Sequence, residues 1–300
     1  MDNYIEVKDV VKQYDGHMAL DHVNLNVPQG CIYGLLGPNG AGKTSLIRII
    51  NLITKPDSGT VTLDGHPITE DDVVNIGYLP EERGLYKKMK VGDQIVYLAR
   101  LKGMSKADAQ REMLDWLDRF DLTEWRDKKL EALSKGMQQK VQFIATVLHR
   151  PKLLIFDEPF SGFDPVNADQ LKVEILRLNR EGSTILFSTH NMESVEAVCE
   201  RISLINHSQV VLEGRVDEIR ETHKKNIIAV DMPKGVALEP NDKLFTLLPP
   251  QEGATDTRIR LNDAVSVREA IAWLNDRYDL RGFHEILPSM HEIFVETVKQ

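Results

Sequence analysis

Cysteine is scarce in this chain, and its scarcity limits the classes of protein to which the chain can belong. The 300 residues contain only two cysteines, Cys31 and Cys199. Two cysteines so far apart form neither a disulfide framework nor the close spacing of a structural metal site. We therefore expect a chain that folds on a hydrophobic core in a reducing compartment, the cytoplasm.

Long apolar runs and an excess of positive charge are also missing. No apolar stretch approaches the roughly 20 residues that a membrane-spanning helix needs, and residues 1–6 show no signal-peptide pattern. We therefore expect any role at a membrane to require a partner. The 46 acidic residues outnumber the 37 lysines and arginines and give a net charge of −9. This balance argues against broad nucleic-acid binding, so no nucleic-acid partner is expected.

The first motif that carries chemistry is a glycine-rich turn, Gly37-Pro38-Asn39-Gly40-Ala41-Gly42-Lys43-Thr44. An apolar run at 31–36 predicts a buried strand before it, and residues 44–52 predict a helix after it, which is the context of a phosphate-binding loop. Glycines let the backbone wrap around phosphates, and the helix N-terminus favours their negative charge. Lys43 would contact the β- and γ-phosphates of ATP, and Thr44 would bind Mg²⁺. The alternative is an ordinary strand-to-helix turn with a surface lysine.

Two carboxylates end the apolar run at residues 152–156. Adjacent residues of a strand point to opposite faces, so Asp157 and Glu158 are expected to have different roles. Asp157 fits a Mg²⁺ contact through water, and Glu158 fits the base that orients or deprotonates the attacking water. The alternative is a simple turn, because Pro159 forces one after the strand.

A further apolar run, at residues 184–189, ends at His190. In an open α/β sheet, ligands bind outside the carboxyl ends of the strands, so His190 would reach the γ-phosphate. The alternative is a histidine at the start of the next helix, since Asn191 and Glu193 are typical of helix starts. Downstream of a phosphate-binding loop, we favour a catalytic role for His190 beside Lys43 and Glu158.

The order of these motifs makes residues 1 to about 218 resemble the nucleotide-binding subunit of an ABC transporter. Leu133-Ser134-Lys135-Gly136-Met137-Gln138 is similar to the signature motif of that family. The resemblance implies that Ser134 and Gly136 contact the γ-phosphate of a nucleotide held by the opposite subunit. Lys135 and Met137 replace the more common Gly and Gln, and neither change removes the hydroxyl or the backbone N–H expected to touch phosphate.

Two further segments carry the resemblance. Tyr14 resembles the aromatic residue that stacks on adenine, and the alternative is an ordinary strand aromatic. Ser161-Gly162-Phe163-Asp164 resembles the loop that couples the two sites of a dimer. The implied nucleotide-binding residues are Tyr14, Gly37, Pro38, Asn39, Gly40, Ala41, Gly42, Lys43, Thr44, Ser45, Ser134 and Gly136.

One position departs from the family pattern. A glutamine usually follows Tyr-Leu-Pro, but here Tyr78-Leu79-Pro80 is followed by Glu81. This position resembles the loop that senses Mg²⁺ and the attacking water and leads to the membrane partner. An ionised glutamate accepts hydrogen bonds but cannot donate them. The implied metal ligands are then Thr44, Glu81 and Asp157, and the alternative is that Glu81-Glu82-Arg83 is a solvated loop.

The patterns together predict an α/β fold: a P-loop NTPase of the ABC-cassette type followed by a small C-terminal α/β domain. The cassette is expected to combine a mostly parallel core sheet, an antiparallel β region and a helical subdomain. We expect the cassette at 1–220, its helical subdomain at about 90–135, a polar linker at 221–225 and an accessory domain at 226–300. One apolar helix face in the subdomain is predicted from Ala109, Met113, Trp116, Leu117 and Phe120.

The accessory domain shows local signals of strands and helices but no catalytic constellation. Strands are expected at 227–230, 243–248 and 257–261. Ser266 with Glu269, and Ser289 with Glu292, have the spacing of capping boxes that start helices. The first helix should bury one face that includes Val267, Ala270, Ile271, Leu274 and Tyr278. His284 and His291 lack metal-ligand partners at useful spacing, so we expect an interaction or regulatory domain.

The resemblance implies an ATPase subunit that energises an exporter through a separate polytopic membrane permease, from the cytoplasm at the inner face of the cell membrane. One cassette whose signature acts in trans implies a dimer with a second copy or a related cassette. One alternative is a soluble ABC ATPase that acts on a macromolecular partner, but DNA-repair members carry a long coiled coil and only about 90 residues separate Lys43 from Ser134. The other is a nucleotide-binding regulator without hydrolysis, against which the presence of Lys43, Asp157, Glu158 and His190 argues.

Overall fold

The computed structural model of the chain describes residues 2–82, 84–233, 235–250 and 256–299. It divides into two compact units, Met1–Val216 and Asp217–Gln300. Each unit has a hydrophobic core of its own, and each is described by itself.

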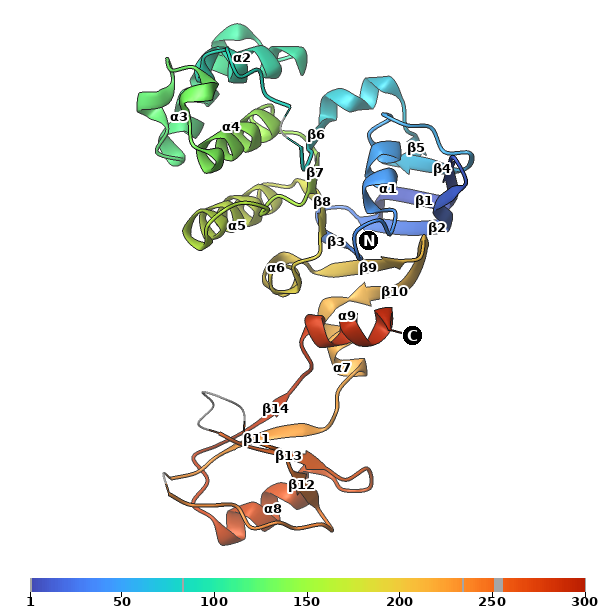
Figure 1. The fold of residues 1–300 in the computed structure, drawn as a ribbon, viewed down its shortest axis with the longest axis vertical. Coiled ribbons are helices and arrows are strands. Elements are labelled where there is room, and N and C mark those ends of the chain that lie inside the picture. Colours follow the sequence, from blue (N-terminus) through green and yellow to red (C-terminus); the bar gives the residue numbers. More distant parts are fainter. Residues whose placement is uncertain (1, 83, 234, 251–255, 300) are drawn as a thin grey trace. The chain divides into compact units, whose positions relative to one another are not determined.

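The first unit opens with an antiparallel sheet of four strands in the order β2-β1-β4-β5 (Figure 1). Buried and exposed residues alternate along much of its long strands, as in a sheet that packs one face on the core. The turn between the first two strands sets Tyr14 opposite His17. The strands are β1 (Asn3–Tyr14), β2 (His17–Pro28), β4 (Ser58–Leu63) and β5 (His66–Pro67).

The core of this unit is a six-stranded sheet in the order β10-β9-β3-β8-β7-β6. Every neighbouring pair is parallel except β9 and β10, which confirms the predicted mostly parallel core sheet. β3, β8 and β7 are neighbours and are buried along their whole length, as expected for strands covered on both faces. The segments that follow these three strands therefore meet at one edge. The strands are β3 (Ile32–Leu36), β6 (Ile76–Leu79), β7 (Leu153–Asp157), β8 (Thr184–Thr189), β9 (Arg201–Asn206) and β10 (Gln209–Arg215).

Helices connect the strands of the core sheet. The helix predicted after the glycine-rich turn is confirmed as α1 (Lys43–Ile50), which buries Leu46, Ile47, Ile49 and Ile50. The other connections are the 3₁₀ helix η1 (Glu70–Asn75), α5 (Pro165–Arg180) and α6 (Met192–Val198).

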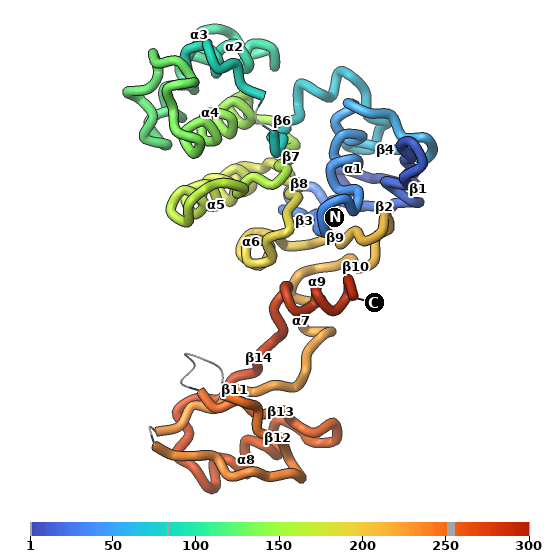
Figure 2. The backbone as a smooth tube through the Cα atoms, viewed as in Figure 1, coloured from blue at the N-terminus to red at the C-terminus, as the bar shows by residue number. Residues whose placement is uncertain are grey.

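A group of helices is inserted between β6 and β7. Figure 2 follows the chain from β6 into these helices and back through α4 to β7. The predicted apolar face is confirmed, since Ala109, Met113, Trp116, Leu117 and Phe120 are all buried. Phe143 of this group packs on Phe156 of β7, with ring centroids 5.6 Å apart. The elements are α2 (Val91–Leu101), α3 (Lys106–Arg119), η2 (Thr123–Trp125), η3 (Leu130–Ala132) and α4 (Lys135–Val147).

The second unit is a four-stranded antiparallel sheet, in the order β12-β13-β11-β14, with helices. Both capping boxes are confirmed, at Ser266 before α8 and at Ser289 before α9. The elements are α7 (Val216–Thr222), β11 (Ile227–Asp231), β12 (Phe245–Leu247), β13 (Thr257–Leu261), α8 (Val267–Arg277), β14 (Gly282–Ile286) and α9 (Met290–Val298).

Three expectations for this unit were wrong. Val267 is exposed although it shares the helix face of Ala270 and Leu274, because it is the first residue of α8 and lies at the end of that face. The strand expected at 243–248 is shorter, since only Phe245–Leu247 pairs with β13. β14 was not predicted, and part of the expected linker is the end of α7.

Candidate functional site

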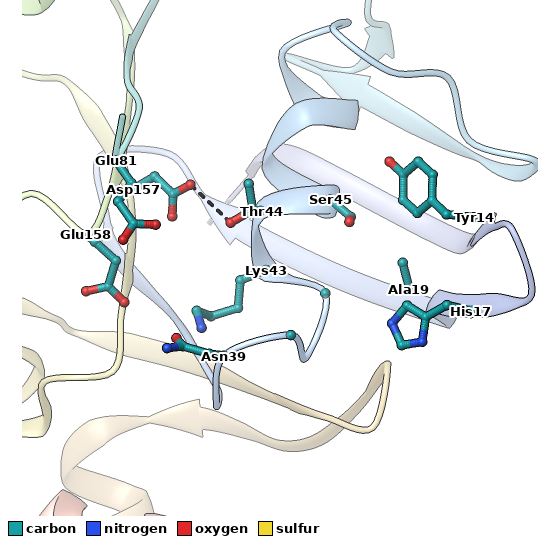
Figure 3. Close-up of a pocket in the computed structure, with 12 residues that line it drawn as sticks. Tyr14, His17, Ala19, Asn39, Lys43, Thr44, Ser45, Glu81, Asp157 and Glu158 are labelled. Atoms are coloured by element: carbon teal, nitrogen blue, oxygen red, sulfur yellow. Dashed lines mark hydrogen bonds between the residues drawn. The ribbon is translucent and has the colours of Figure 1, made fainter. Parts of the chain in front are cut away.

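A cavity of about 340 Å³ lies where the phosphate-binding loop, the β1–β2 hairpin and the end of β7 converge (Figure 3). Ten of the sequence-predicted site residues line it: Tyr14, Asn39, Gly40, Gly42, Lys43, Thr44, Ser45, Glu81, Asp157 and Glu158. His17 and Ala19 complete its lining. The other predicted residues, Gly37, Pro38, Ala41, Ser134, Gly136 and His190, are not among the lining residues.

Two glycines shape the turn that forms one wall of the cavity. Gly37 and Gly42 have φ values of +148° and +115°. A Cβ atom on Gly37 would lie 2.2 Å from the carbonyl oxygen of Ile205, and one on Gly42 would lie 2.2 Å from that of Ala19. Because backbone atoms cannot give way at such distances, both positions require glycine. The turn therefore packs tightly on β9 of the core sheet and on β2 of the antiparallel sheet.

Lys43 is the first residue of α1 and is buried, with 6% of its surface exposed. Its Nζ donates hydrogen bonds to the carbonyl oxygens of Gly37, at 2.8 Å, and Pro38, at 3.2 Å. Burial lowers the pKa of Lys43, whereas the carboxylates of Glu158, Asp157 and Glu81 act to raise it. The ammonium group thus folds back on its own loop, next to three acidic side chains.

Asp157 ends β7 and is 3% exposed. The Thr44 hydroxyl donates to its Oδ2 at 3.2 Å (Figure 3). The Ser188 hydroxyl, on β8, donates to its Oδ1. The carboxylate is therefore oriented by hydroxyl groups from both sides and faces the start of α1.

Glu158 does not continue the alternating side-chain directions of strand β7. Its φ of +50° lies in the left-handed region, and both it and Asp157 line the same cavity. The expectation that the two carboxylates point to opposite faces is therefore wrong, because the strand ends between them. Their partners still differ: Glu158 accepts hydrogen bonds from Thr189 Oγ1 at 3.2 Å and contacts His190 Nδ1 at 2.7 Å.

His190 reaches the site only through Glu158. Its side chain is 60% exposed, whereas that of Glu158 is 10% exposed. An ionised carboxylate can only accept, so Nδ1 of His190 carries the proton of this hydrogen bond. The histidine thereby fixes one carboxylate oxygen of Glu158.

The β1–β2 hairpin supplies the far end of the cavity. Tyr14 is 39% exposed, and the ammonium group of Lys12 lies 5.3 Å from its ring centroid. His17, paired with Tyr14 across the hairpin, and Ala19 also line the cavity. The sequence analysis did not predict His17 or Ala19 as site residues. They could have been found only by predicting a hairpin whose turn follows Tyr14 and whose register sets His17 opposite it.

Glu81 follows β6 and lines the cavity, yet it is exposed. Figure 3 shows its side chain beside those of Asp157 and Glu158. The two alternatives predicted for Glu81 are therefore both partly met: its side chain is exposed to solvent, and its carboxylate lies next to the site. Arg83, from the same predicted loop, lies outside the described residues.

The signature segment starts α4 at a distance from this cavity. Ser134 is exposed and caps the helix, with its Oγ accepting the N–H of Met137 at 3.3 Å. This capping leaves the side chain and the first turn of α4 accessible to another molecule.

A second hollow, an apolar groove of about 400 Å³, lies between the end of α1, β6 and the inserted helices. Its walls include exposed Ile53 and Leu101, and its floor includes Gln142 and His149. Burial and the nearby Lys102 lower the pKa of His149 to about 4. Within the part of the chain that the structure describes, no helix is both long and apolar enough to cross a membrane.

Sequence comparisons match three family models to parts of the chain. The family described as ABC transporter matches residues 20–161. The family described as the C-terminal domain of DrrA1-3-like ATP-binding proteins matches residues 214–298. A third, described as an AAA domain, putative AbiEii toxin, Type IV TA system, matches residues 129–196.

Individual relatives extend the match to the whole chain. YhaQ, an ABC transporter ATP-binding protein of Bacillus subtilis (strain 168), is 42% identical over 98% of each chain. The daunorubicin/doxorubicin resistance ATP-binding protein DrrA of Streptomyces peucetius is 30% identical over 97% of this chain and 91% of its own length. A solved structure of an ATP-binding subunit of an ABC transporter superposes with a TM-score of 0.68 at 30% identity, covering 73% of this chain and 92% of the other. With the site geometry, these similarities establish that the chain belongs to the ATP-binding subunits of ABC transporters, a family of ATPases.

Proposed function

We propose that this ATPase hydrolyses Mg-ATP in the cavity at the end of β7 and thereby powers export through a separate membrane permease. The observation that carries the proposal is the convergence of Lys43, Thr44, Asp157 and Glu158 on one cavity. Lys43 would exchange its two loop carbonyls for oxygens of the β- and γ-phosphates, so binding costs it no hydrogen bond. Tyr14 would stack on the adenine at the other end.

The donor set fits Mg²⁺. The Thr44 hydroxyl and the Asp157 carboxylate are hydrogen-bonded to each other, and Glu81 lines the same cavity. Such oxygens are the ligands that Mg²⁺ prefers. Among the described residues, no cluster of three or more His, Cys, Asp or Glu side chains can hold a metal ion by itself. We therefore propose that Thr44 and Asp157 would hold the ion, Asp157 through water, with Glu81 beside them; the bound ion would neutralise phosphate charge.

Glu158 is assigned as the group that orients and deprotonates the attacking water. Its side chain is 10% exposed and lines the cavity, where it would meet a water bound beside the γ-phosphate. The hydrogen bond from His190 fixes Oε1, which leaves Oε2 and its remaining lone pairs to accept a proton from water. The exposed far side of His190 is free to approach the γ-phosphate.

A second copy of the cassette, or a related one, would complete the site. Ser134 and Gly136 lie outside the lining of this cavity, and Ser134 is exposed at the start of α4. The helix N-terminus presents unpaired backbone N–H groups suited to phosphate. We propose that these groups contact the nucleotide held by the opposite subunit, so that ATP draws two cassettes together.

The apolar groove is proposed as the docking site for a cytoplasmic segment of the permease. Ile53 and Leu101 are 59% and 62% exposed on its walls. Docking there would hold the chain at the inner face of the membrane, with residues 1–220 as the cassette and 226–300 as an accessory domain. The near full-length similarity to an ATP-binding protein named for drug resistance supports export over import.

The test is fractionation of the cells that naturally express the chain. We expect the chain to sediment with membranes and Leu101→Asp to shift it to the supernatant while ATP binding is retained. Leu114→Asp is the matched control, because Leu114 is 43% exposed but lies outside the groove. A chain that stays in the supernatant, or sediments with ribosomes, would contradict the proposal and favour a non-transport ATPase.

A further inference from the structure

Helix α4, which starts at the signature segment, holds several loops of the core through side-chain amides. Gln142 lies two turns into this helix and is 7% exposed. It is not part of the nucleotide cavity, but it lines the apolar groove. A buried amide normally makes hydrogen bonds, because leaving one unpaired costs about 1–3 kcal/mol.

The side-chain amide of Gln142 donates hydrogen bonds to the backbone on both sides of Glu81. Its Nε2 donates to the carbonyl oxygen of Pro80 at 3.4 Å and to that of Glu82 at 3.3 Å. One nitrogen with two hydrogens therefore spans the carbonyls that flank a single residue. β6 has already ended at Leu79, so no strand pairing holds the backbone at this point. The two hydrogen bonds tie the backbone on either side of Glu81 to the helix.

Neighbouring turns of the same helix extend this contact. The hydroxyl of Thr146, one turn further on, lies 3.5 Å from the carbonyl oxygen of Tyr78, but its shorter hydrogen bond, at 2.9 Å, is to the carbonyl oxygen of Gln142 within the helix. Gln139, one turn earlier, donates to the carbonyl oxygen of Ser161. The N–H of Ser161 in turn donates to the carbonyl oxygen of Glu158 at 3.0 Å. The helix thus holds the loop that carries Glu81 and the loop that follows Glu158.

We propose that Gln142 is a positioning residue of the ATPase: through the carbonyls of Pro80 and Glu82 its amide holds Glu81 at the cavity. This inference rests on the proposed function. A displacement of α4 moves the amide and with it both carbonyls that flank Glu81.

The test compares Gln142→Met with wild type in a Mg²⁺ titration of ATPase rate at fixed ATP. Methionine keeps the volume of glutamine but removes both donors. Release of the loop should raise the Mg²⁺ concentration at half-maximal rate by roughly threefold to tenfold, the equivalent of one or two ordinary hydrogen bonds. Glu81→Gln should shift it in the same direction, because the carboxylate that favours the cation is gone.

A double variant separates positioning from a merely structural role. If Gln142 acts through Glu81, Gln142→Met added to Glu81→Gln should cause no further shift. Gln94→Met is the matched control: Gln94 is fully buried on α2, and its amide has no hydrogen-bond partner among the residues that the structure describes. It should leave the Mg²⁺ dependence unchanged.

Three results would overturn the inference. They are a Gln142→Met curve that superimposes on wild type, an additive shift in the double variant, and an equal shift in Gln94→Met. If Gln142→Met does not fold, Gln142→Asn replaces it, since its amide is one methylene too short to span both carbonyls, and the same outcomes decide. A wild type without Mg²⁺-dependent hydrolysis overturns the proposed function as well, whereas normal wild-type hydrolysis with unshifted variants overturns this inference alone.

Discussion

Replacing Glu158 with glutamine changes one charge in the cavity and almost nothing else. The side chains have the same length, and glutamine keeps an oxygen that can accept from Thr189 or His190. Glutamine also offers N–H donors, so one of the two present hydrogen bonds, at 3.2 and 2.7 Å, has to rearrange. The loss of one such hydrogen bond costs about 1 kcal/mol, so the folded state should persist.

The effect on hydrolysis should be much larger than the effect on folding. A positioned general base contributes about 10²- to 10⁴-fold to a rate, which corresponds to about 3–5 kcal/mol of transition-state stabilisation. ATP binding should not weaken, because the cavity loses one of three carboxylates that face Lys43 and repel phosphate. At an effective dielectric near 20, a charge pair about 5 Å apart contributes on the order of 3 kcal/mol before screening.

The assay measures phosphate release at saturating Mg-ATP, together with size-exclusion chromatography in ATP. Glu158→Gln should hydrolyse ATP at least about 100-fold more slowly and elute as an ATP-bound dimer. Glu82→Gln is the control, since Glu82 is exposed and does not line the cavity. Turnover within threefold of wild type (~0.7 kcal/mol) would refute the assignment of Glu158 as the base.

Two further predictions concern stability. The pKa of His149 in the folded state, about 4, lies below its ordinary value of 6.5. Because the unfolded chain therefore binds the proton more tightly, the free energy of unfolding should fall as the pH drops from 6.5 to 4. The expected loss is on the order of 2–3 kcal/mol. Urea unfolding at both pH values should show a smaller loss in His149→Gln; an equal loss would assign the pH dependence to other groups. A chain ending after Thr222 should fold and bind ATP, because both sheets of the first unit lie before Val216; global unfolding by circular dichroism would show that the C-terminal unit is part of the cassette's core.

The elements that were predictable carry their signals locally. A glycine-rich turn between an apolar run and a helical pattern predicts β3 and α1, and the capping boxes at Ser266 and Ser289 predict the starts of α8 and α9. β14 carries no such signal. Gly282–Ile286 includes exposed His284 and Glu285, and it is a strand because it pairs with β11, a segment more than 50 residues away. Pairing at that separation is set by the tertiary fold, which propensity does not encode.

The candidate site shows the same limit at the level of single residues. Asp157 and Glu158 follow each other in sequence, but the left-handed φ of Glu158 cancels the alternation on which their predicted opposite orientation depends. His17 enters the cavity only because the hairpin register sets it opposite Tyr14. Residue type and spacing therefore predicted which chemical groups the site contains, whereas the backbone geometry determines which of these side chains enter the same cavity.

Helix α4 illustrates why coupling between sites is hardest to read from sequence. Ser134, at its start, is recognised by a motif, but Gln142 donates to main-chain carbonyls, and every residue carries such an acceptor. The hydrogen-bond partners of Gln142 could therefore not be predicted from the sequence, because only the fold places the carbonyls of Pro80 and Glu82 beside the helix. Because the same side chain lines the apolar groove, a ligand of the groove and a ligand of the nucleotide cavity would both act on this loop. If one position of α4 favours both, linkage requires that each ligand strengthen the binding of the other by the same factor.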